Sequence, residues 1–156
     1  MPQVLVTPPT LEALRALRTA ATREQITITV GSGYRSLEQQ EAALRAAAER
    51  DGRREAERQI APPGFSEHHL GTALDFGIGA PVGVDFARTP QAAWLAARAA
   101  EFGFALSYPP GSESVTGMVP EPWHYRYVGR EHATNAKAAG IALETYLEKL
   151  PGASRP

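Results

Sequence analysis

Histidine and carboxylate side chains that could hold a metal ion lie in two short segments of this sequence. The first segment reads SEHHLGTALD and places His68 seven residues before Asp75, with a glycine between them that lets the chain fold back. In the second segment, EPWH, Glu121 precedes His124 by three residues. Two imidazole nitrogens and one carboxylate oxygen would give zinc three protein ligands and leave its fourth position open to water.

A zinc site with an open position is typical of catalysis rather than of structure. Zinc lowers the pKa of bound water toward about 7, and a nearby carboxylate can then take a proton from it during attack on a carbonyl. Glu121 is the candidate for that role. Pro122 excludes the helical H-E-x-x-H pattern, so these ligands would come from extended backbone. Residue types alone leave a second interpretation open, in which the same side chains are ordinary polar structure.

Composition narrows the class of protein. A chain of 156 residues that is 43% hydrophobic predicts a single domain over residues 1–156, with its core at about 24–150 and a short polar C-terminal tail. Sixteen basic and 17 acidic residues give a net charge of −1, which argues against a nucleic-acid partner. The chain has no cysteine, so a metal must be held by histidine and carboxylates.

Helical and strand patterns surround the two segments. Strands are expected at residues 26–30, 73–76 and 123–128. A helix is expected at 11–21 after an N-cap at Thr10, with Leu11 on its apolar face. A second is expected at 37–50 after a capping box of Ser36 and Gln39. Further helices are expected at 53–59, 90–102 and 133–150, the last strained at Gly140. Because the helices come before and after a strand-rich middle without regular alternation, the fold class is α+β.

The strand expected at 123–128 has two chemically different faces. Trp123, Tyr125 and Tyr127 alternate with His124 and Arg126, and successive side chains in a strand point to opposite sides. The aromatic side chains are expected to pack in a core, although Trp123 could also brace the site. Arg126 shares the face of His124 and is expected to form a structural ion pair rather than to bind a substrate carboxylate.

Three motifs together resemble VanY-type D-alanyl-D-alanine carboxypeptidases. They are SGYRS at residues 32–36, followed by Gln40, then SEHHLGTALD at 66–75 and EPWHYRYVG at 121–129. With weaker matches between and after them, the resemblance extends from Ser32 to Leu147. The family belongs to a group of zinc peptidases that includes lysostaphin-type enzymes and the hedgehog domain. The resemblance implies a small antiparallel sheet flanked by helices, with the metal in a groove across it.

The resemblance assigns roles to the residues of the motifs. It implies that His68, Asp75 and His124 bind one zinc ion and that Glu121 is the general base. A non-catalytic zinc module, like the hedgehog domain, remains an alternative, and the presence of Glu121 argues against it.

Three further residues are expected at the substrate groove by the same resemblance. Arg35 corresponds to an arginine that holds the substrate near the scissile carbonyl, where a guanidinium can stabilise developing negative charge. Gln40 and Ser66 match positions that line the groove. The chain departs from the family at Pro120, where many relatives carry an aromatic residue, and this change could reshape one wall of the groove.

The remaining two histidines are not expected to bind the metal. His69 should point away from the site if its segment is extended. His132, just before the last predicted helix, is expected to be a surface or capping residue.

The function implied by the resemblance is hydrolysis of the C-terminal D-amino acid from a peptidoglycan stem peptide. An L,D-carboxypeptidase or a cell-wall endopeptidase on the same scaffold remains an alternative. The sequence shows neither a signal peptide nor an apolar run of about 20 residues. The substrate nevertheless implies action at the bacterial envelope or outside the cell, with a cytoplasmic protein or a phage lysin as alternatives. The oligomeric state is left open, with a monomer as the expectation.

Overall fold

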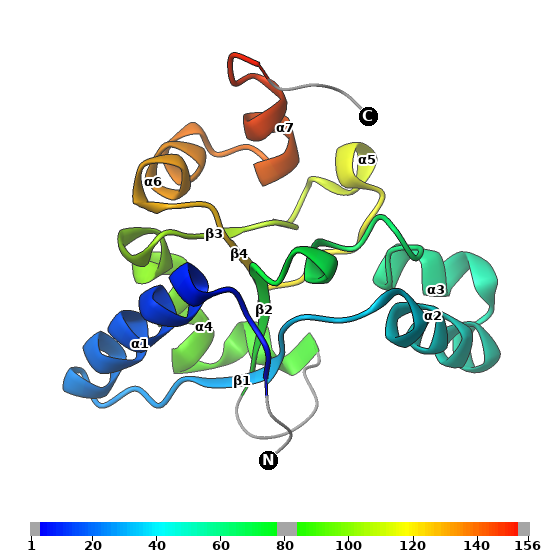
Figure 1. Cartoon of the computed structure of the whole chain (residues 1–156), viewed down its shortest axis with the longest axis horizontal. Coiled ribbons are helices and arrows are strands. Elements are labelled where there is room, and N and C mark those ends of the chain that lie inside the picture. Colours follow the sequence, from blue (N-terminus) through cyan, green and yellow to red (C-terminus); the bar gives the residue numbers. More distant parts are fainter. Residues whose placement is uncertain (1–3, 78–83, 153–156) are drawn as a thin grey trace.

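A computed structural model of the chain describes residues 4–77 and 84–152, and an antiparallel sheet lies at its centre (Figure 1). The strand order is β1-β2-β4-β3, and each neighbouring pair is antiparallel. The strands in these described ranges are β1 (Thr29–Ser32), β2 (Ala73–Gly77), β3 (Phe104–Leu106) and β4 (His124–Tyr127).

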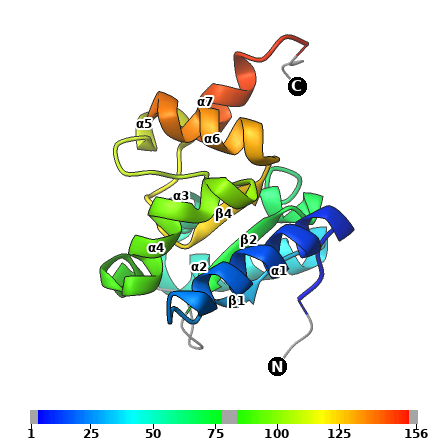
Figure 2. The same ribbon diagram turned by 90° about the vertical axis from the view of Figure 1, so that its left-hand side faces the viewer.

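Helices flank this sheet on two sides. The α-helices are α1 (Pro8–Arg23), α2 (Leu37–Asp51), α3 (Arg53–Gln59), α4 (Pro90–Arg98), α5 (Glu113–Thr116), α6 (Arg130–Ala139) and α7 (Leu143–Glu148). The short 3-10 helices in the described part of the chain are η1 (Glu67–Leu70), η2 (Val84–Arg88) and η3 (Ala99–Phe102). Helices α1, α4 and α6 lie to one side of the strands, and α2 and α3 lie to the other (Figures 1 and 2). The predicted α+β class with a small antiparallel sheet is therefore confirmed.

The main core lies between the sheet and the helices α1 and α4. Leu14 and Leu17 follow helical spacing on α1, and both are buried against the same cluster as Phe76 of β2. The ring of Phe76 meets those of Phe104 and Tyr125 edge-on, at centroid distances of 6.0 and 5.7 Å. Burying each large apolar side chain contributes about 1.5–3 kcal/mol, so this cluster stabilises the strands that carry the polar site.

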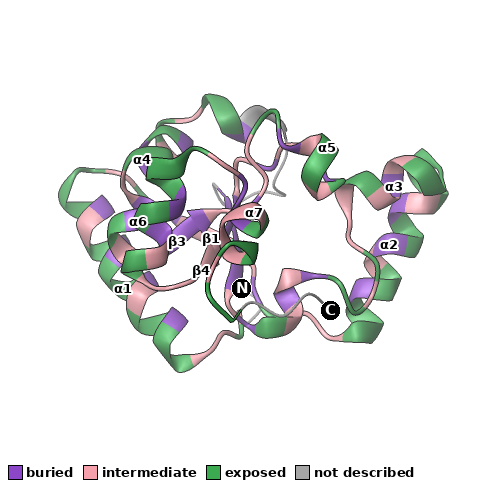
Figure 3. Cartoon of the chain, turned by 90° about the horizontal axis from the view of Figure 1, so that it is seen from above, coloured by how far each residue is buried: buried purple, intermediate pink, exposed green. Residues whose placement is uncertain are grey.

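A second, smaller core joins α2 to α3. Its buried members are Leu44, Ala47 and Ala56, with Ile60 packed beside them. Helix α2 begins as predicted, because the Ser36 hydroxyl accepts from the Gln39 amide at 3.2 Å while the Gln39 side chain accepts from the Ser36 amide at 2.9 Å. The two helices form one projecting unit beside the sheet (Figure 3).

The predicted start of the first helix is wrong. The helix begins at Pro8 with Thr7 as its N-cap, because prolines at residues 8 and 9 fit the first turn, where their missing amide hydrogens are not needed. Thr10 lies inside the helix, fully buried, with its hydroxyl 2.8 Å from that of Thr7. Leu11, expected on the apolar face, is exposed.

The first strand lies further along the chain than its β-branched run predicts. The Ile26 amide still donates to the Ala21 carbonyl, and Gln25 has a positive φ of 61°, so the chain is turning out of α1 at residues 25–26. Pairing begins only at Thr29, opposite Gly77.

The C-terminal half contains more breaks than predicted. Gly140 adopts φ +64°, ends α6 and separates it from α7, so residues 133–150 are two helices rather than one. Strand β3 has three residues, too few to show an alternating pattern, and the sequence analysis missed it. The expected helix at 90–102 ends at Arg98 and continues as η3. Part of the predicted polar tail, residues 153–156, lies outside the described residues.

The described helices include none that is both long and apolar enough to cross a membrane.

Candidate metal centre and active site

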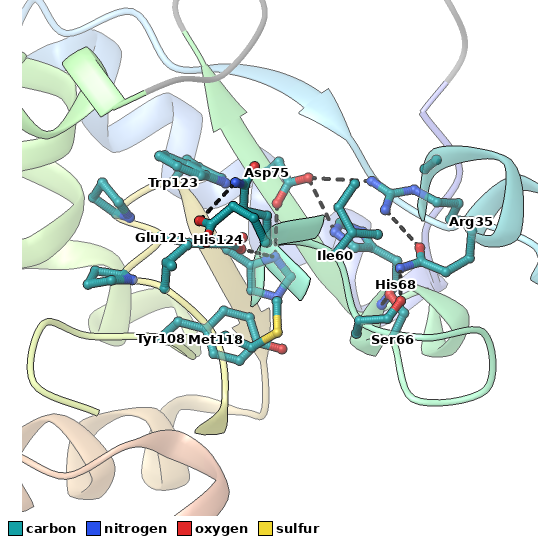
Figure 4. Close-up of a pocket in the computed structure, with 18 of the residues that line it drawn as sticks. Arg35, Ile60, Ser66, His68, Asp75, Tyr108, Met118, Glu121, Trp123 and His124 are labelled. Carbon is teal, nitrogen blue, oxygen red and sulfur yellow. Dashed lines mark hydrogen bonds and ion pairs between the residues drawn. The ribbon is translucent and has the colours of Figure 1, made fainter. Parts of the chain in front are cut away.

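The three predicted metal ligands meet on one face of the sheet. Asp75 of β2 lies directly opposite His124 of β4 in the strand register, and η1 brings His68 to the same point. One ligand atom from each residue lies within 4.8 Å of the other two, and all three residues are buried. Figure 4 shows the two imidazoles and the carboxylate converging at the pocket.

Hydrogen bonds on the outer side of each imidazole fix which nitrogen faces the cluster. His68 Nδ1 donates to the Gly33 carbonyl at 2.7 Å, and its Nε2 lies 3.2 Å from Asp75 Oδ2. His124 Nε2 lies 2.9 Å from Glu67 Oε2, and its Nδ1 lies 2.9 Å from Asp75 Oδ1. Such outward bonds are typical of metal-binding histidines, because they orient the ring and leave the other nitrogen free to ligate. The donor set fits one zinc ion.

The surroundings of His124 favour a positive charge. Burial alone would lower the pKa of His124, but its hydrogen bonds to Asp75 and Glu67 outweigh this and raise the pKa to about 10. Burial alone would raise the pKa of Asp75, and its hydrogen bonds to the two imidazoles bring it well below its usual range. A bound cation would be stabilised by the same negatively charged carboxylates.

Glu121 lies beside this cluster at the end of a loop that leads into β4. Its amide donates to the Tyr108 carbonyl at 3.0 Å, and its own carbonyl accepts from the His124 amide at 3.0 Å. Its carboxylate is buried, with Oε2 3.7 Å from His124 Nδ1. Burial raises the pKa of Glu121 to about 7, with help from Asp75 and against the attraction of His124. In the metal-free protein, Glu121 can therefore take up or release a proton near neutral pH.

Arg35 reaches the cluster from the side of α2. One guanidinium nitrogen donates to Gln40 Oε1 at 2.8 Å, and another donates to Ser32 Oγ at 3.0 Å and lies 3.7 Å from Asp75 Oδ2. Gln40 is almost fully buried, and its amide nitrogen donates to the Ala61 carbonyl at 2.7 Å. Both polar ends of Gln40 are thus occupied in holding Arg35 in place.

Ser66 lies at the start of η1, next to the first ligand. Its hydroxyl accepts from the His68 amide at 3.4 Å, so it caps the turn that carries His68. Arg35, Gln40 and Ser66 all line the same pocket, which agrees with where the sequence placed them. Contact of each with substrate stays a prediction.

A pocket of about 770 Å³ opens over the cluster and runs toward α2 and α3. Pro120 forms part of its wall, and the neighbouring Val119 amide donates to the Arg58 carbonyl of α3 at 2.8 Å. This bond ties the loop before β4 to the helical unit. Other lining residues are Ala43, Glu55, Gln59, Ile60, Ala61, Tyr108, Met118, Glu121 and Trp123.

The other two histidines lie outside the ligand cluster. His69 donates through Nδ1 to the Arg35 carbonyl at 2.7 Å and accepts at Nε2 from the Gly64 amide at 3.1 Å. It therefore braces the backbone around Arg35, and the expected extended segment is wrong because residues 67–70 form a 3-10 turn. His132 lies within α6 and packs against Tyr146, with Nδ1 3.1 Å from the hydroxyl oxygen.

The sequence analysis missed Glu67. This carboxylate contacts Ser107, His124 and Arg126, at 2.6, 2.9 and 3.1 Å. The ion pair expected for Arg126 is confirmed, with Glu67 as its partner. The sequence did indicate that an acidic residue lies near His124, because Arg126 shares the strand face of His124 and needs an acidic partner there.

The comparisons with known proteins agree with this geometry. Residues 3–130 match the VanY family, described as D-alanyl-D-alanine carboxypeptidase. A D-alanyl-D-alanine carboxypeptidase of Enterococcus faecalis is 36% identical over 143 residues, which are 86% of this chain and 52% of the relative. The putative carboxypeptidase YodJ of Bacillus subtilis is 34% identical over 142 residues, 89% of this chain and 52% of the relative. The chain thus spans about half the length of these curated relatives.

Solved structures show the same fold. VanYB in complex with D-alanine-D-alanine superposes with a TM-score of 0.84 at 33% identity, covering 94% of this chain and 84% of that one. The LdcB LD-carboxypeptidase gives 0.85 at 32% identity, covering 94% and 70%. A VanY E175A mutant in complex with Zn(II) gives 0.82 at 33% identity, covering 91% and 83%. From the matched residues, the shared fold and the converging ligand set, we conclude that this chain belongs to the VanY family.

Proposed function

We propose that the protein is a zinc-dependent carboxypeptidase that removes the terminal D-alanine from peptidoglycan stem peptides ending in D-alanyl-D-alanine. The observation that carries this proposal is the buried cluster of His68, Asp75 and His124, with Glu121 and Arg35 beside it at one open pocket. The names of the curated relatives and the D-alanine-D-alanine complex of VanYB support the substrate class.

Three residues would hold the metal. His68 Nε2, an Asp75 carboxylate oxygen and His124 Nδ1 are the atoms that the outward hydrogen bonds leave free for it. When bound, zinc supplies Lewis-acid chemistry, because it polarises a carbonyl group and lowers the pKa of water.

Glu121 would move the proton. As water attacks the scissile carbonyl carbon, the Glu121 carboxylate accepts the proton that the water loses. When the C–N bond breaks, Glu121 returns this proton to the amine nitrogen of the departing D-alanine. Glu121 is buried beside the ligand cluster, with its Oε2 3.7 Å from His124 Nδ1, so it is placed to accept a proton and then to donate it.

Arg35 would stabilise the charge that develops during the attack. Its guanidinium is fixed by Gln40 and Ser32 at the edge of the cluster, so it need not reorganise when the carbonyl oxygen becomes negative. No serine nucleophile takes part in this scheme, and we therefore expect no penicillin adduct in an intact-mass measurement.

Removal of the single D-alanine of a tetrapeptide, an L,D-activity, is the second candidate. The likeness to the LdcB LD-carboxypeptidase, with a TM-score of 0.85, favours it. The two activities differ in the configuration of the residue before the scissile bond.

Mass spectrometry of purified muropeptides tests both activities. We expect pentapeptide stems to lose one alanine, tetrapeptide stems to stay intact, and the reaction to stop with a chelator and return with zinc. Cleavage of tetrapeptides alone would replace the first candidate by the second, and an internal cut would indicate an endopeptidase.

Two adjacent histidines allow a matched test of the metal site. We expect His68→Ala to lose bound zinc and His69→Ala to retain one zinc per chain, because only His68 belongs to the cluster. Metal content by elemental analysis measures this. Equal zinc content in the two variants would contradict the assigned ligands.

The proposed substrate also fixes the proposed place of action. Stem peptides are part of the cell wall, so we propose that the protein works at the cell envelope. Fractionation of cells producing the full-length native protein would test this placement.

A further inference from the structure

The carboxylate of Glu67 lies behind the metal cluster, on the side of His124 that faces away from Asp75. Its side chain is 16% exposed, and it comes from η1, one residue before the ligand His68. It does not belong to the set of side chains that could hold the metal ion. It nevertheless lies within hydrogen-bonding distance of one of them.

Both oxygens of Glu67 are held as acceptors. Oε2 accepts from the Ser107 hydroxyl at 2.6 Å, and Oε1 accepts from Arg126 Nη1 at 3.1 Å. Arg126 can only donate, and its positive charge favours the ionised carboxylate. His124 Nε2, 2.9 Å from Oε2, must therefore carry a hydrogen and donate it. His124 Nδ1 lies 2.9 Å from Asp75 Oδ1 and donates to it in the metal-free protein. When a metal ion replaces the hydrogen on Nδ1, the neutral imidazole keeps its hydrogen on Nε2 and presents the Nδ1 lone pair to the cluster.

The two histidine ligands differ in what orients them. His68 Nδ1 donates to the Gly33 carbonyl, a neutral acceptor within the backbone. His124 donates to a carboxylate that is itself fixed by Ser107 and Arg126. A charged acceptor makes the imidazole a more basic ligand than a neutral acceptor does, because it stabilises positive charge on the ring.

We propose that Glu67 is a positioning residue of the metal centre, which sets the tautomer and orientation of His124 and thereby strengthens metal binding. Ser107 and Arg126 in turn hold Glu67. The inference rests on the metal site of the proposed function and is independent of which peptide bond the enzyme cleaves.

Zinc affinity, measured by competition with a chromophoric chelator, tests the inference directly. We expect Glu67→Ala to bind zinc up to about 100-fold more weakly and Glu67→Gln about tenfold more weakly, the range found when such outer partners of metal ligands are removed. Glu144→Gln is the matched control. Glu144 lines the same hollow as Glu67, which has a volume of about 620 Å³. In the described part of the chain, however, no hydrogen bond or ion pair joins Glu144 to His124. The zinc affinity of this variant should equal that of the wild type.

Nitrogen NMR of the histidine rings gives a readout that a purely structural role would not change. In the zinc-loaded wild type, we expect the ring hydrogen of His124 on Nε2 and that of His68 on Nδ1. In Glu67→Ala, the His124 hydrogen should exchange faster with water, while His68 serves as the internal control.

Unchanged zinc affinity in both Glu67 variants would overturn the proposal. So would a zinc-loaded wild type in which the His124 ring hydrogen lies on Nδ1. Circular dichroism of the metal-free proteins shows whether each variant is folded. If Glu67→Ala does not fold, Glu67→Gln, which has the same size, decides alone. Because zinc binding is measured without substrate, a failure of the proposed peptidase activity would leave this result intact and would be recognised separately in the muropeptide assay.

Discussion

The two walls of the pocket are built in different ways. One wall carries His68, Asp75 and His124 on the sheet and η1, with Glu121 on the loop that leads into β4, and the strands behind this wall pack into the main core. The opposite wall belongs to α2 and α3, whose shared core buries one large side chain, Leu44, among alanines, with Ile60 partly buried beside it. The comparison indicates that the three candidate metal ligands, which need the most closely fixed mutual geometry, lie on the strongly packed wall, whereas Arg35 is held partly by Gln40 of the other wall.

Few bonds join the weakly packed wall to the rest of the molecule. Among the described residues, Gln40 links α2 to Arg35, and the Val119 amide links the loop before β4 to Arg58 of α3. Figure 3 shows α2 and α3 projecting beside the strands. We infer that this unit shapes the pocket and can adjust to a substrate without disturbing the metal ligands.

The largest expected effect is a loss of activity when Glu121, on the strongly packed wall, is substituted. Glu121→Gln keeps the size of the side chain but cannot accept a proton, so kcat should fall by about 10²–10⁴-fold. Zinc content should stay at one ion per chain, because Glu121 is outside the ligand cluster. Turnover of a stem pentapeptide together with elemental analysis measures both. Undiminished turnover with zinc retained would contradict the role of Glu121.

A pair of leucine substitutions compares the two cores directly. Leu17 is fully buried in the main core and Leu44 is 7% exposed in the small one, and Leu→Ala at either site should cost about 2–5 kcal/mol locally. We expect Leu17→Ala to lower the melting temperature of the whole protein and to weaken zinc binding at elevated temperature. Leu44→Ala should instead speed hydrogen exchange in residues 37–59 and raise KM.

The same two variants can also contradict the idea that the two walls are independent. If Leu44→Ala lowered zinc affinity as much as Leu17→Ala, the α2–α3 unit would be coupled to the metal wall as tightly as the main core is. Hydrogen exchange followed by mass spectrometry, measured on the zinc-loaded proteins, separates local from global opening.

The proposed metal ligands could be predicted from the sequence because they lie in short motifs that resemble the VanY family. Local structure places His68 near Asp75 and Glu121 near His124, and the pairing of β2 with β4 then brings Asp75 opposite His124. Glu67 could not be assigned in this way. Its partners Ser107 and Arg126 are 40 and 59 residues away, and they meet Glu67 only through the pairing of β4 with both β2 and β3.

Fold elements were predictable where local chemistry marks their ends. The capping box at Ser36 and the proline at residue 90 gave correct helix starts. The strand at 29–32 was misplaced because its position depends on pairing with β2 and not on its β-branched run. Gly140 shows the same limit, because helical periodicity continues on both sides of a residue whose positive φ ends the helix.

The pH dependence of stability probes the buried charge on the metal wall. Burial raises the pKa of Glu121 from its ordinary 4.5 to about 7, so in the metal-free protein the folded state holds this proton more tightly than the unfolded state. The contribution of Glu121 to the free energy of unfolding should therefore fall as the pH rises from about 4.5 to 7, by on the order of 3 kcal/mol.

Glu121→Gln is the control for this measurement, since it does not titrate. Urea unfolding measures the stability of both proteins in the presence of a chelator. As the pH rises from about 4.5 to 7, we expect the wild type to lose stability relative to Glu121→Gln. Parallel curves for the two proteins would show that Glu121 is not desolvated as the structure indicates.

The smallest effect is expected at the start of α2, on the weakly packed wall. Ser36→Ala removes the hydroxyl that accepts from the Gln39 amide and should cost about 0.5–2 kcal/mol, whereas Ser36→Gly, which lets water reach the free amide, should cost only a few tenths. We expect the loss to appear as faster hydrogen exchange in α2 with zinc affinity unchanged, because the hydroxyl contacts no metal ligand. A loss of zinc affinity in Ser36→Ala would mean that the order of α2 reaches the cluster through Gln40 and Arg35, and the two walls would then act as one.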